Sequence, residues 1–111
     1  MSNHPEEENL TEAIVSSIHA FSFEAFNLAK LVVSGTDTES LRQQARDLKE
    51  HLPEIAAQMR DADEEYQADL NNVLSEARLD LEYVLAGGGR PSSMRLAHVI
   101  REQTSGDALP Q

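Results

Sequence analysis

Four histidines are the side chains of this 111-residue sequence best suited to bind a metal ion or to transfer a proton. None of them follows a glutamate by three residues, so the Glu-x-x-His element of di-iron helical bundles is missing. His98 and Glu102 are four residues apart and would be neighbours on a helix, but two ligands are too few for a structural metal site. The chain has no cysteine, which excludes a disulfide, a zinc knuckle and a thiol nucleophile. We therefore expect no metal site and no cofactor.

A glycine-rich segment at 87–93 invites comparison with a phosphate-binding loop. It lacks the Gly-x-x-x-x-Gly-Lys-Ser/Thr pattern and follows a helical pattern instead of a strand. Its three glycines are better explained as the end of a helix followed by a linker. Ser16 and Ser17 stand near His19 without an orienting carboxylate at a suitable spacing. We predict that the protein is not an enzyme.

Carboxylates are the most informative side chains of this sequence. The chain has 20 Asp and Glu residues against 9 Lys and Arg, a formal net charge of −11. That sign disfavours direct binding to nucleic acid. Segment 53–86 holds nine of the acids and two arginines. On a helical wheel six of these acids fall within an arc of about 100°, which we call the acidic ridge: Glu54, Asp61, Glu65, Asp69, Glu76 and Asp80.

The acidic ridge predicts either a solvated, solubilising surface or a binding surface. Each pair of like charges one turn apart destabilises the helix by a few tenths of a kcal/mol. Pairs of opposite charge could have occupied the same positions and would have stabilised it. Carboxylates spaced by one turn lie about 6 Å apart, close to the phosphate spacing of a nucleic-acid strand. We predict that the ridge binds a basic surface on a protein partner, with a nucleic-acid mimic as one form of this. The predicted binding residues are Asp61, Glu65, Asp69, Glu76 and Asp80.

All three phenylalanines fall within residues 21–26. Phe21 and Phe26 follow the apolar face of the first helical pattern, whereas Phe23 and Leu31 fall outside it on a helical wheel. One interpretation is a helix buried on nearly all sides. The other is that Phe23 and Leu31 form an apolar contact for a partner or for a second copy.

The positions of glycine and proline predict which elements carry these side chains. Long stretches without either residue separate them, and apolar residues recur within those stretches at steps of three and four. We expect helices over 10–33, about 38–52, 53–86 and about 93–103. Pro53 either opens the third helix at its first turn or kinks a continuous one, and we favour a new helix. Alternating patterns typical of strands are absent. The predicted fold class is all-α, an irregular bundle of about four helices, two long and two short, with no β-sheet.

The predicted domain organisation is a single helical domain at 10–103 between disordered tails at 1–9 and 104–111. A third helix of about 50 Å would be covered incompletely by its short neighbours, which suggests a homodimer. Arginines at 90, 95 and 101 indicate that the fourth helix docks across the acidic third one. Asp63 would project into the apolar stripe of the third helix and would need a partner there.

The leading functional hypothesis is a small acidic, non-enzymatic protein that binds and inhibits or regulates another macromolecule. Phage-encoded anti-CRISPR and anti-restriction inhibitors provide an analogy by class and charge alone. The alternative is a helical interaction or assembly protein, such as a secretion chaperone or scaffold subunit, that acts through apolar helix faces. A third possibility is a regulatory partner of a DNA-binding protein. We expect a cytoplasmic protein with no membrane contact, since the sequence shows neither a signal-peptide pattern nor an apolar span.

Overall fold

The computed structural model describes the backbone of residues 5–91 and 93–108, and every regular element in these ranges is helical. The predicted all-α bundle without a sheet is therefore confirmed for the described residues. The four α-helices contain 29, 20, 22 and 15 residues in chain order, and a 3-10 turn joins the second to the third. They are α1 (Pro5–Val33), α2 (Glu39–Gln58), η1 (Met59–Asp61), α3 (Glu64–Leu85) and α4 (Met94–Ala108).

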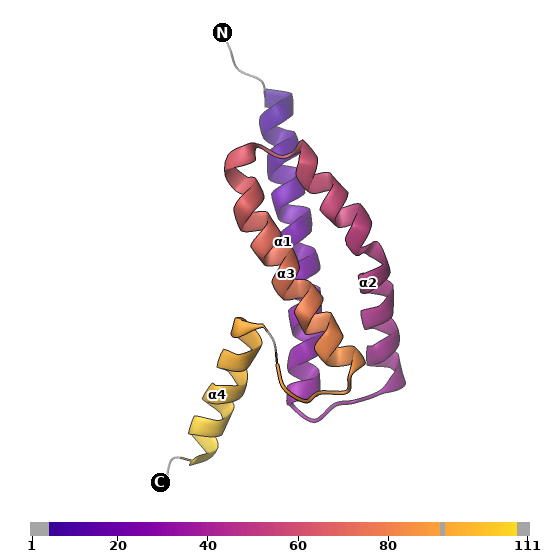
Figure 1. Ribbon diagram of the computed structural model, residues 1–111, viewed down its shortest axis with the longest axis vertical. Coiled ribbons are helices and arrows are strands. Elements are labelled where there is room, and N and C mark those ends of the chain that lie inside the picture. Colours follow the sequence, from indigo (N-terminus) through magenta and orange to yellow (C-terminus); the bar gives the residue numbers. More distant parts are fainter. Residues whose placement is uncertain (1–4, 92, 109–111) are drawn as a thin grey trace.

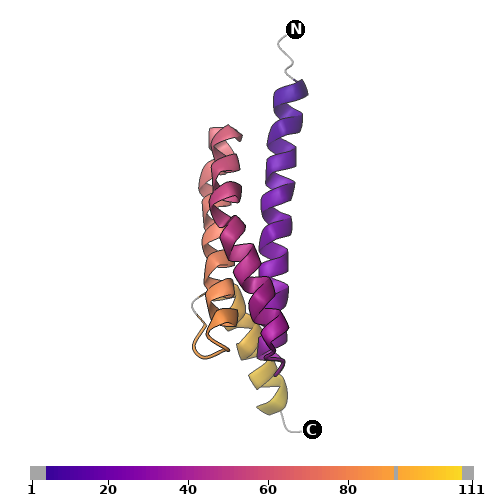
Figure 2. The ribbon, with the colours of Figure 1, turned by 90° about the vertical axis from the view of Figure 1, so that its right-hand side faces the viewer.

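The first three helices run up and down beside one another, and α4 stands at one end of them (Figure 1). The molecule is long and flat, with extents of 62 × 33 × 16 Å. Figure 2 shows the narrow direction, in which α1 lies on one side of the α2 and α3 pair. This arrangement leaves the N-terminal half of α1 beside the α2–α3 corner, while α4 lies near the opposite end.

The core lies between α1, α2 and α3. Ile18, Leu70 and Leu81 are fully buried, and they belong to the apolar faces that the spacing of three and four predicted. Ala25 on α1 and Ala77 on α3 are also fully buried, and such small side chains let two helices approach closely. The buried contacts therefore concentrate on the α1–α3 pair, with α2 packed against it.

Glycines end α1 and α3, as the sequence predicted. At the end of α1, the amides of Gly35 and Thr36 bond to carbonyls one turn back at distances of 2.9 Å. Gly87 and Gly88 repeat the arrangement after α3, with both bonds at 3.0 Å. Gly35 and Gly87 have φ values of 99° and 75°, in the left-handed region where a Cβ is unfavourable.

The prediction that a new helix begins at Pro53 is wrong. Helix α2 continues through Pro53 to Gln58, and the chain breaks at the 3-10 turn that follows. Because Pro53 has no N–H, the carbonyl of Lys49 loses its helical donor, a cost that the packing of α2 offsets. Ala62, which ends the turn, is buried with an extended ψ of 158°.

This break shortens the predicted third helix. Helix α3 has 22 residues and spans about 33 Å, so it matches α2 in length. The third helix is therefore about as long as its neighbour, and the uncovered apolar length that suggested a homodimer is absent from it. Self-association itself stays a prediction. The predicted tails overlap the outer helices, because the backbone at 5–9 and 104–108 is helical. Residues 1–4 and 109–111 of those tails lie outside the described part of the chain.

The expectation of a buried Asp63 is also wrong. Asp63 is exposed and occupies the N-cap position of α3, where the backbone is not helical. The helical wheel assigned it to the apolar stripe because the wheel assumed one unbroken helix over 53–86. With the break at 59–63, this carboxylate faces solvent and needs no buried partner.

Candidate functional site

The structure divides the predicted acidic ridge into two parts. Asp61 at the end of η1 and Glu65 and Asp69 on α3 are exposed, as a binding surface requires. Glu76 is half-buried, and its carboxylate lies 3.9 Å from Nε of Arg95. The prediction that Asp80 belongs to this surface needs correction, because its side chain is 0% exposed and cannot contact a partner from solvent. The ridge therefore ends near Asp69.

Asp80 is the centre of a buried polar cluster that attaches α4 to the rest of the molecule. Its Oδ2 accepts a hydrogen bond from Nε of Arg95 at 2.8 Å and forms an ion pair with Nη2 of the same guanidinium at 2.7 Å. Its Oδ1 accepts a hydrogen bond from the hydroxyl of Ser93. The same hydroxyl accepts the amide of Leu96 at 3.2 Å and so caps α4. We call Asp80, Ser93 and Arg95 the Asp80 cluster.

Arg95 also reaches α1. Its Nη2 donates to the carbonyl of Ser22 at 3.1 Å, and its guanidinium lies 4.6 Å from the centre of the Phe26 ring. Three helices thus meet at one cation, and Leu96 beside it is fully buried. The predicted docking of the fourth helix across the acidic third one is present at Arg95, which explains why Asp80 is buried and Glu76 is half-buried.

The remaining negative charge gathers at one end of the molecule. Segments 5–19 and 49–75 hold 11 of the 20 carboxylates and only two of the nine cations. Helix topology brings these segments together, because the start of α1 lies beside the end of α2, the η1 turn and the start of α3 (Figure 1). We call this region the acidic end. The rest of the chain holds nine carboxylates and seven cations and is nearly balanced.

The carboxylates of the acidic end between residues 50 and 69 form no ion pair with any described side chain. Among the described side chains, the ion pairs involve acids at 37, 39, 76, 80, 82 and 102, and none between 50 and 69. Lys49 at this end pairs with Glu82 at 3.8 Å. Glu54, Asp61 and Asp69 are exposed to solvent with no cation within ion-pair distance in the described part of the chain. They are available to an external cation.

Two large apolar side chains are exposed among these acids. Leu10 is 49% exposed and Tyr66 is 42% exposed. Each borders a surface hollow of about 300 Å³. Sequence reasoning assigned both to apolar helix faces and missed their exposure. The signal was their position, since Leu10 precedes the first buried residue among the described side chains of α1 and Tyr66 lies in the first turn of α3.

Phe23 and Leu31 are exposed, so the interpretation of a first helix buried on nearly all sides is wrong at these two positions. Phe23 is 61% exposed and lines a hollow with Val73 and Arg95, whereas Leu31 is 44% exposed and lines another with Val99. Both therefore border the seam between α1 and α4, in separate hollows. Their role in binding a partner stays a prediction.

His51 on α2 lies among negatively charged side chains that affect its pKa. Its Nδ1 lies 2.8 Å from the carbonyl oxygen of Asp47. This hydrogen bond raises the pKa of His51, and the negative charges of Glu54, Asp47 and Glu50 raise it further. The side chain is exposed, so it titrates in contact with solvent.

The described residues hold no group of three or more His, Asp or Glu side chains arranged to bind a metal ion. His98 and Glu102 form the pair that the sequence indicated, with Nε2 and Oε1 2.9 Å apart and both side chains exposed. Within the same residues, no helix combines the length and the low polarity that crossing a bilayer requires. No family model, curated protein or solved structure matches the chain.

Proposed function

We propose that this chain is a non-enzymatic interaction protein that binds a basic surface of a partner protein through its acidic end and thereby inhibits or regulates that partner. One observation carries the proposal. Exposed carboxylates that form no ion pair within the described part of the chain surround two exposed apolar side chains, Leu10 and Tyr66, at one end of an elongated molecule.

The two kinds of side chain have complementary roles in binding. Exposed acids attract a basic surface over long range and raise the association rate. Apolar and aromatic anchors that become buried on contact, such as Leu10 and Tyr66, supply most of the binding free energy and slow dissociation. A surface with only charge would bind weakly and with little selectivity, whereas the acidic end has both.

The structure limits how far nucleic-acid mimicry can extend along the ridge. A row of six acids along one helix would imitate a strand backbone, but Asp80 is buried and Glu76 is engaged by Arg95. The exposed acids that remain lie between residues 54 and 69 on two helices and a turn. This shape favours a compact basic patch on a protein over a long nucleic-acid channel.

A second candidate function rests on Phe23 and Leu31. Their exposure beside α4 favours an assembly protein that binds a partner, or a second copy, through apolar contacts. The two candidates differ in their response to salt. Binding through the acidic end weakens steeply as ionic strength rises, whereas binding through Phe23 and Leu31 changes little.

Charge reversal at the acidic end tests the leading proposal. The partner is first captured from the native host at low salt, and its affinity is then measured for purified variants. Asp61→Lys, Glu65→Lys and Asp69→Lys together should weaken binding at least tenfold while circular dichroism stays unchanged, because these side chains are exposed.

The matched control reverses three acids outside the acidic end: Asp37, Glu39 and Glu102. It makes the same change in net charge and disrupts surface ion pairs, a kind of contact that individually stabilises proteins by less than about 1 kcal/mol, so the control should remain folded. The control should bind within threefold of the wild type. Equal affinities for the two triple variants would contradict the proposal, because net charge alone would then account for binding.

A further inference from the structure

We infer that the seam between α1 and α2 is a docking groove for a single amphipathic helix of the partner, with a basic polar face. This inference rests on the proposed function and names the kind of segment that binds. The groove shares Leu10, Glu54 and Asp61 with the acidic end but does not include Glu65 and Asp69 of α3, so those two acids allow the two proposals to be tested separately.

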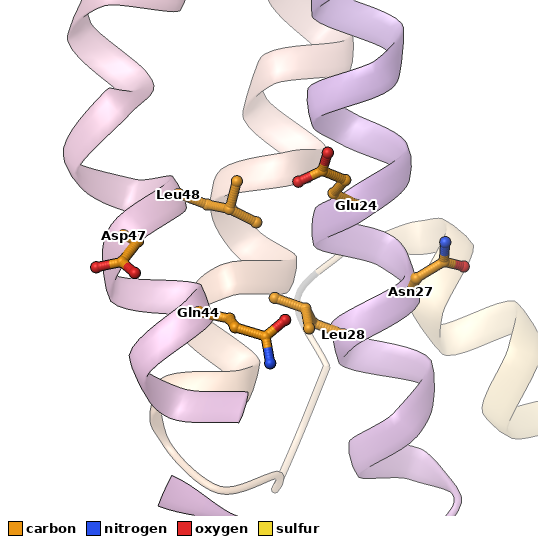
Figure 3. A pocket seen from close by; sticks show the side chains of 6 residues that line it. All are labelled: Glu24, Asn27, Leu28, Gln44, Asp47 and Leu48. Atoms are coloured by element: carbon orange, nitrogen blue, oxygen red, sulfur yellow. The ribbon is translucent and has the colours of Figure 1, made fainter. Parts of the chain in front are cut away.

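Two hollows lie along this seam. The larger has a volume of about 400 Å³ and lies between the C-terminal half of α1 and the N-terminal half of α2. Leu28 and Leu48 project into it from the two helices, while Asp47 and Asn27 point outward at its rims (Figure 3). The second hollow, of about 300 Å³, lies between the start of α1 and the end of α2 and is lined by apolar Leu10, Ala13 and Ile14 beside Asp61.

The α1 side of the seam has the spacing of a helix-packing face. Its positions alternate steps of three and four residues, the repeat by which one helix packs along another. The described members with small side chains, Ala13, Ser17 and Ala20, leave room for a neighbouring backbone to approach. The full row is Leu10, Ala13, Ser17, Ala20, Glu24 and Asn27.

The α2 side continues the same spacing with polar side chains. Its row is Gln44, Asp47, His51, Glu54 and Gln58. A helix laid in the seam would therefore contact an apolar and small row on one side and a polar row on the other. A fourth helix of this kind would complete the α1–α2–α3 body as a four-helix bundle, in which each helix has two neighbours.

Charge determines which helix fits. Four carboxylates border the groove, at positions 24, 47, 54 and 61, and neither row contains a lysine or an arginine. The raised pKa of His51, partly due to the charges of Asp47 and Glu54, is consistent with the negative potential of this seam. A helix with lysines or arginines flanking an apolar stripe would pair its cations with these rims and place its stripe on Leu28 and Leu48.

Helices of this chain are poor occupants. The Asp80 cluster and the buried Leu96 hold α4 on the opposite side of α1. A second copy would bring a chain of net charge −11 against four carboxylates. A basic helix from another protein meets neither obstacle.

Synthetic helices test the inference directly. The probe is a 21-residue peptide with leucine at the heptad a and d positions and lysine at most others, labelled with a fluorophore. Anisotropy at 150 mM NaCl should show binding to the full chain at least tenfold tighter than that of a peptide with the same composition in scrambled order. Equal binding of the two peptides would overturn the inference, because attraction would then depend on charge alone.

Groove-filling variants locate the binding. Ala13→Trp and Gln44→Trp each place a large side chain in one of the two hollows from an exposed position, so folding should be retained and is checked by circular dichroism. Each should weaken the affinity for the lysine peptide at least tenfold. Ser75→Trp, at an exposed position on α3, is the matched control and should leave affinity unchanged. Unchanged affinity in both groove variants would overturn the inference.

One more variant separates this inference from the proposed function. Glu65→Lys with Asp69→Lys removes acids of α3 that lie outside the groove. If this pair abolishes peptide binding while both groove variants retain it, the acidic end binds basic segments and the groove does not. If the groove variants no longer bind the peptide but still bind the captured partner, the natural partner does not use the groove. The groove inference then fails for that partner, although the proposed function stands.

Discussion

Asp80 shows why a helical wheel is an incomplete guide at the level of single residues. The wheel correctly placed Asp80 on the same side of the helix as Glu76, but it cannot include a neighbour that arrives from a distant segment. Burial of Asp80 depends on Arg95 and Ser93, which follow a glycine turn and return across α3. The sequence did indicate that the arginines after residue 89 would dock on the acidic helix, but not which acid they would cover.

Asp80→Asn should destabilise the fold by about 3 kcal/mol, because it leaves the guanidinium of Arg95 without its buried counterion. The measurement is urea denaturation followed by circular dichroism. Glu76→Gln is the control, since that carboxylate is half-buried and 3.9 Å from Nε of Arg95, and it should cost less than about 1 kcal/mol. Equal effects of the two substitutions would show that Asp80 is not the principal partner of Arg95.

His51 should titrate above its ordinary pKa of 6.5. The hydrogen bond to the carbonyl of Asp47 and the surrounding carboxylates favour the protonated ring in the folded state. A group whose folded pKa is raised stabilises the fold fully below its unfolded pKa, and that contribution is lost as pH rises through the folded pKa. An NMR titration of the ring protons measures this shift, and Glu54→Gln should reduce it. A pKa at or below 6.5 would contradict the assignment.

At the level of elements, the sequence predicted helix interiors and glycine ends well but placed one boundary wrongly. Pro53 suggested a helix start because proline is favoured in a first turn. The better signal was ten residues later, where Asp63 precedes Glu64 and Glu65, since an N-cap aspartate and acids in the first turn favour a helix start. The apolar period alone continued through the break, because Ala62 and Tyr66 preserve its spacing.

Pro53→Ala distinguishes the two boundaries. In the interior of α2 the substitution restores a hydrogen bond to the carbonyl of Lys49 and removes a steric clash, so unfolding free energy should rise by about 1–3 kcal/mol. Gln43→Ala, at an exposed position of the same helix, should change it by less than about 0.5 kcal/mol. A loss of stability in Pro53→Ala would instead favour a helix that begins at that residue.

At the level of the whole molecule, the order of the helices gathers exposed acids from separate segments at one end of the bundle. The sequence placed most of the negative charge in one segment, but the acidic end also includes the start of α1, which is more than 40 residues away in the chain. Only the antiparallel order of α1, α2 and α3 brings these acids together. Exposure of Leu10 and Tyr66 is likewise a property of the bundle's end, where helices have fewer neighbours.

The acidic end should reduce folding stability at low salt. Glu54, Asp61 and Asp69 lie outside the first turns of the α-helices, so they gain little from a helix N-terminus, and their like charges repel. The triple variant Glu54→Gln, Asp61→Asn and Asp69→Asn is therefore expected to have an unfolding free energy higher by about 1 kcal/mol in 20 mM NaCl. In 500 mM NaCl the gain should largely disappear, because salt screens exposed charges.

Urea is the appropriate denaturant for this measurement, since guanidinium chloride would itself screen the charges. Glu39→Gln provides a control of opposite sign, because hydrogen bonds from Arg46 and Arg42 lower the pKa of Glu39 and its charge stabilises the start of α2. This substitution should lower stability at the same low salt. A triple variant no more stable than the wild type would mean that the acids carry no folding cost. The unpaired carboxylates would then be adequately explained as solvated surface, and the binding role would fall to Leu10, Tyr66 and the apolar positions of α1.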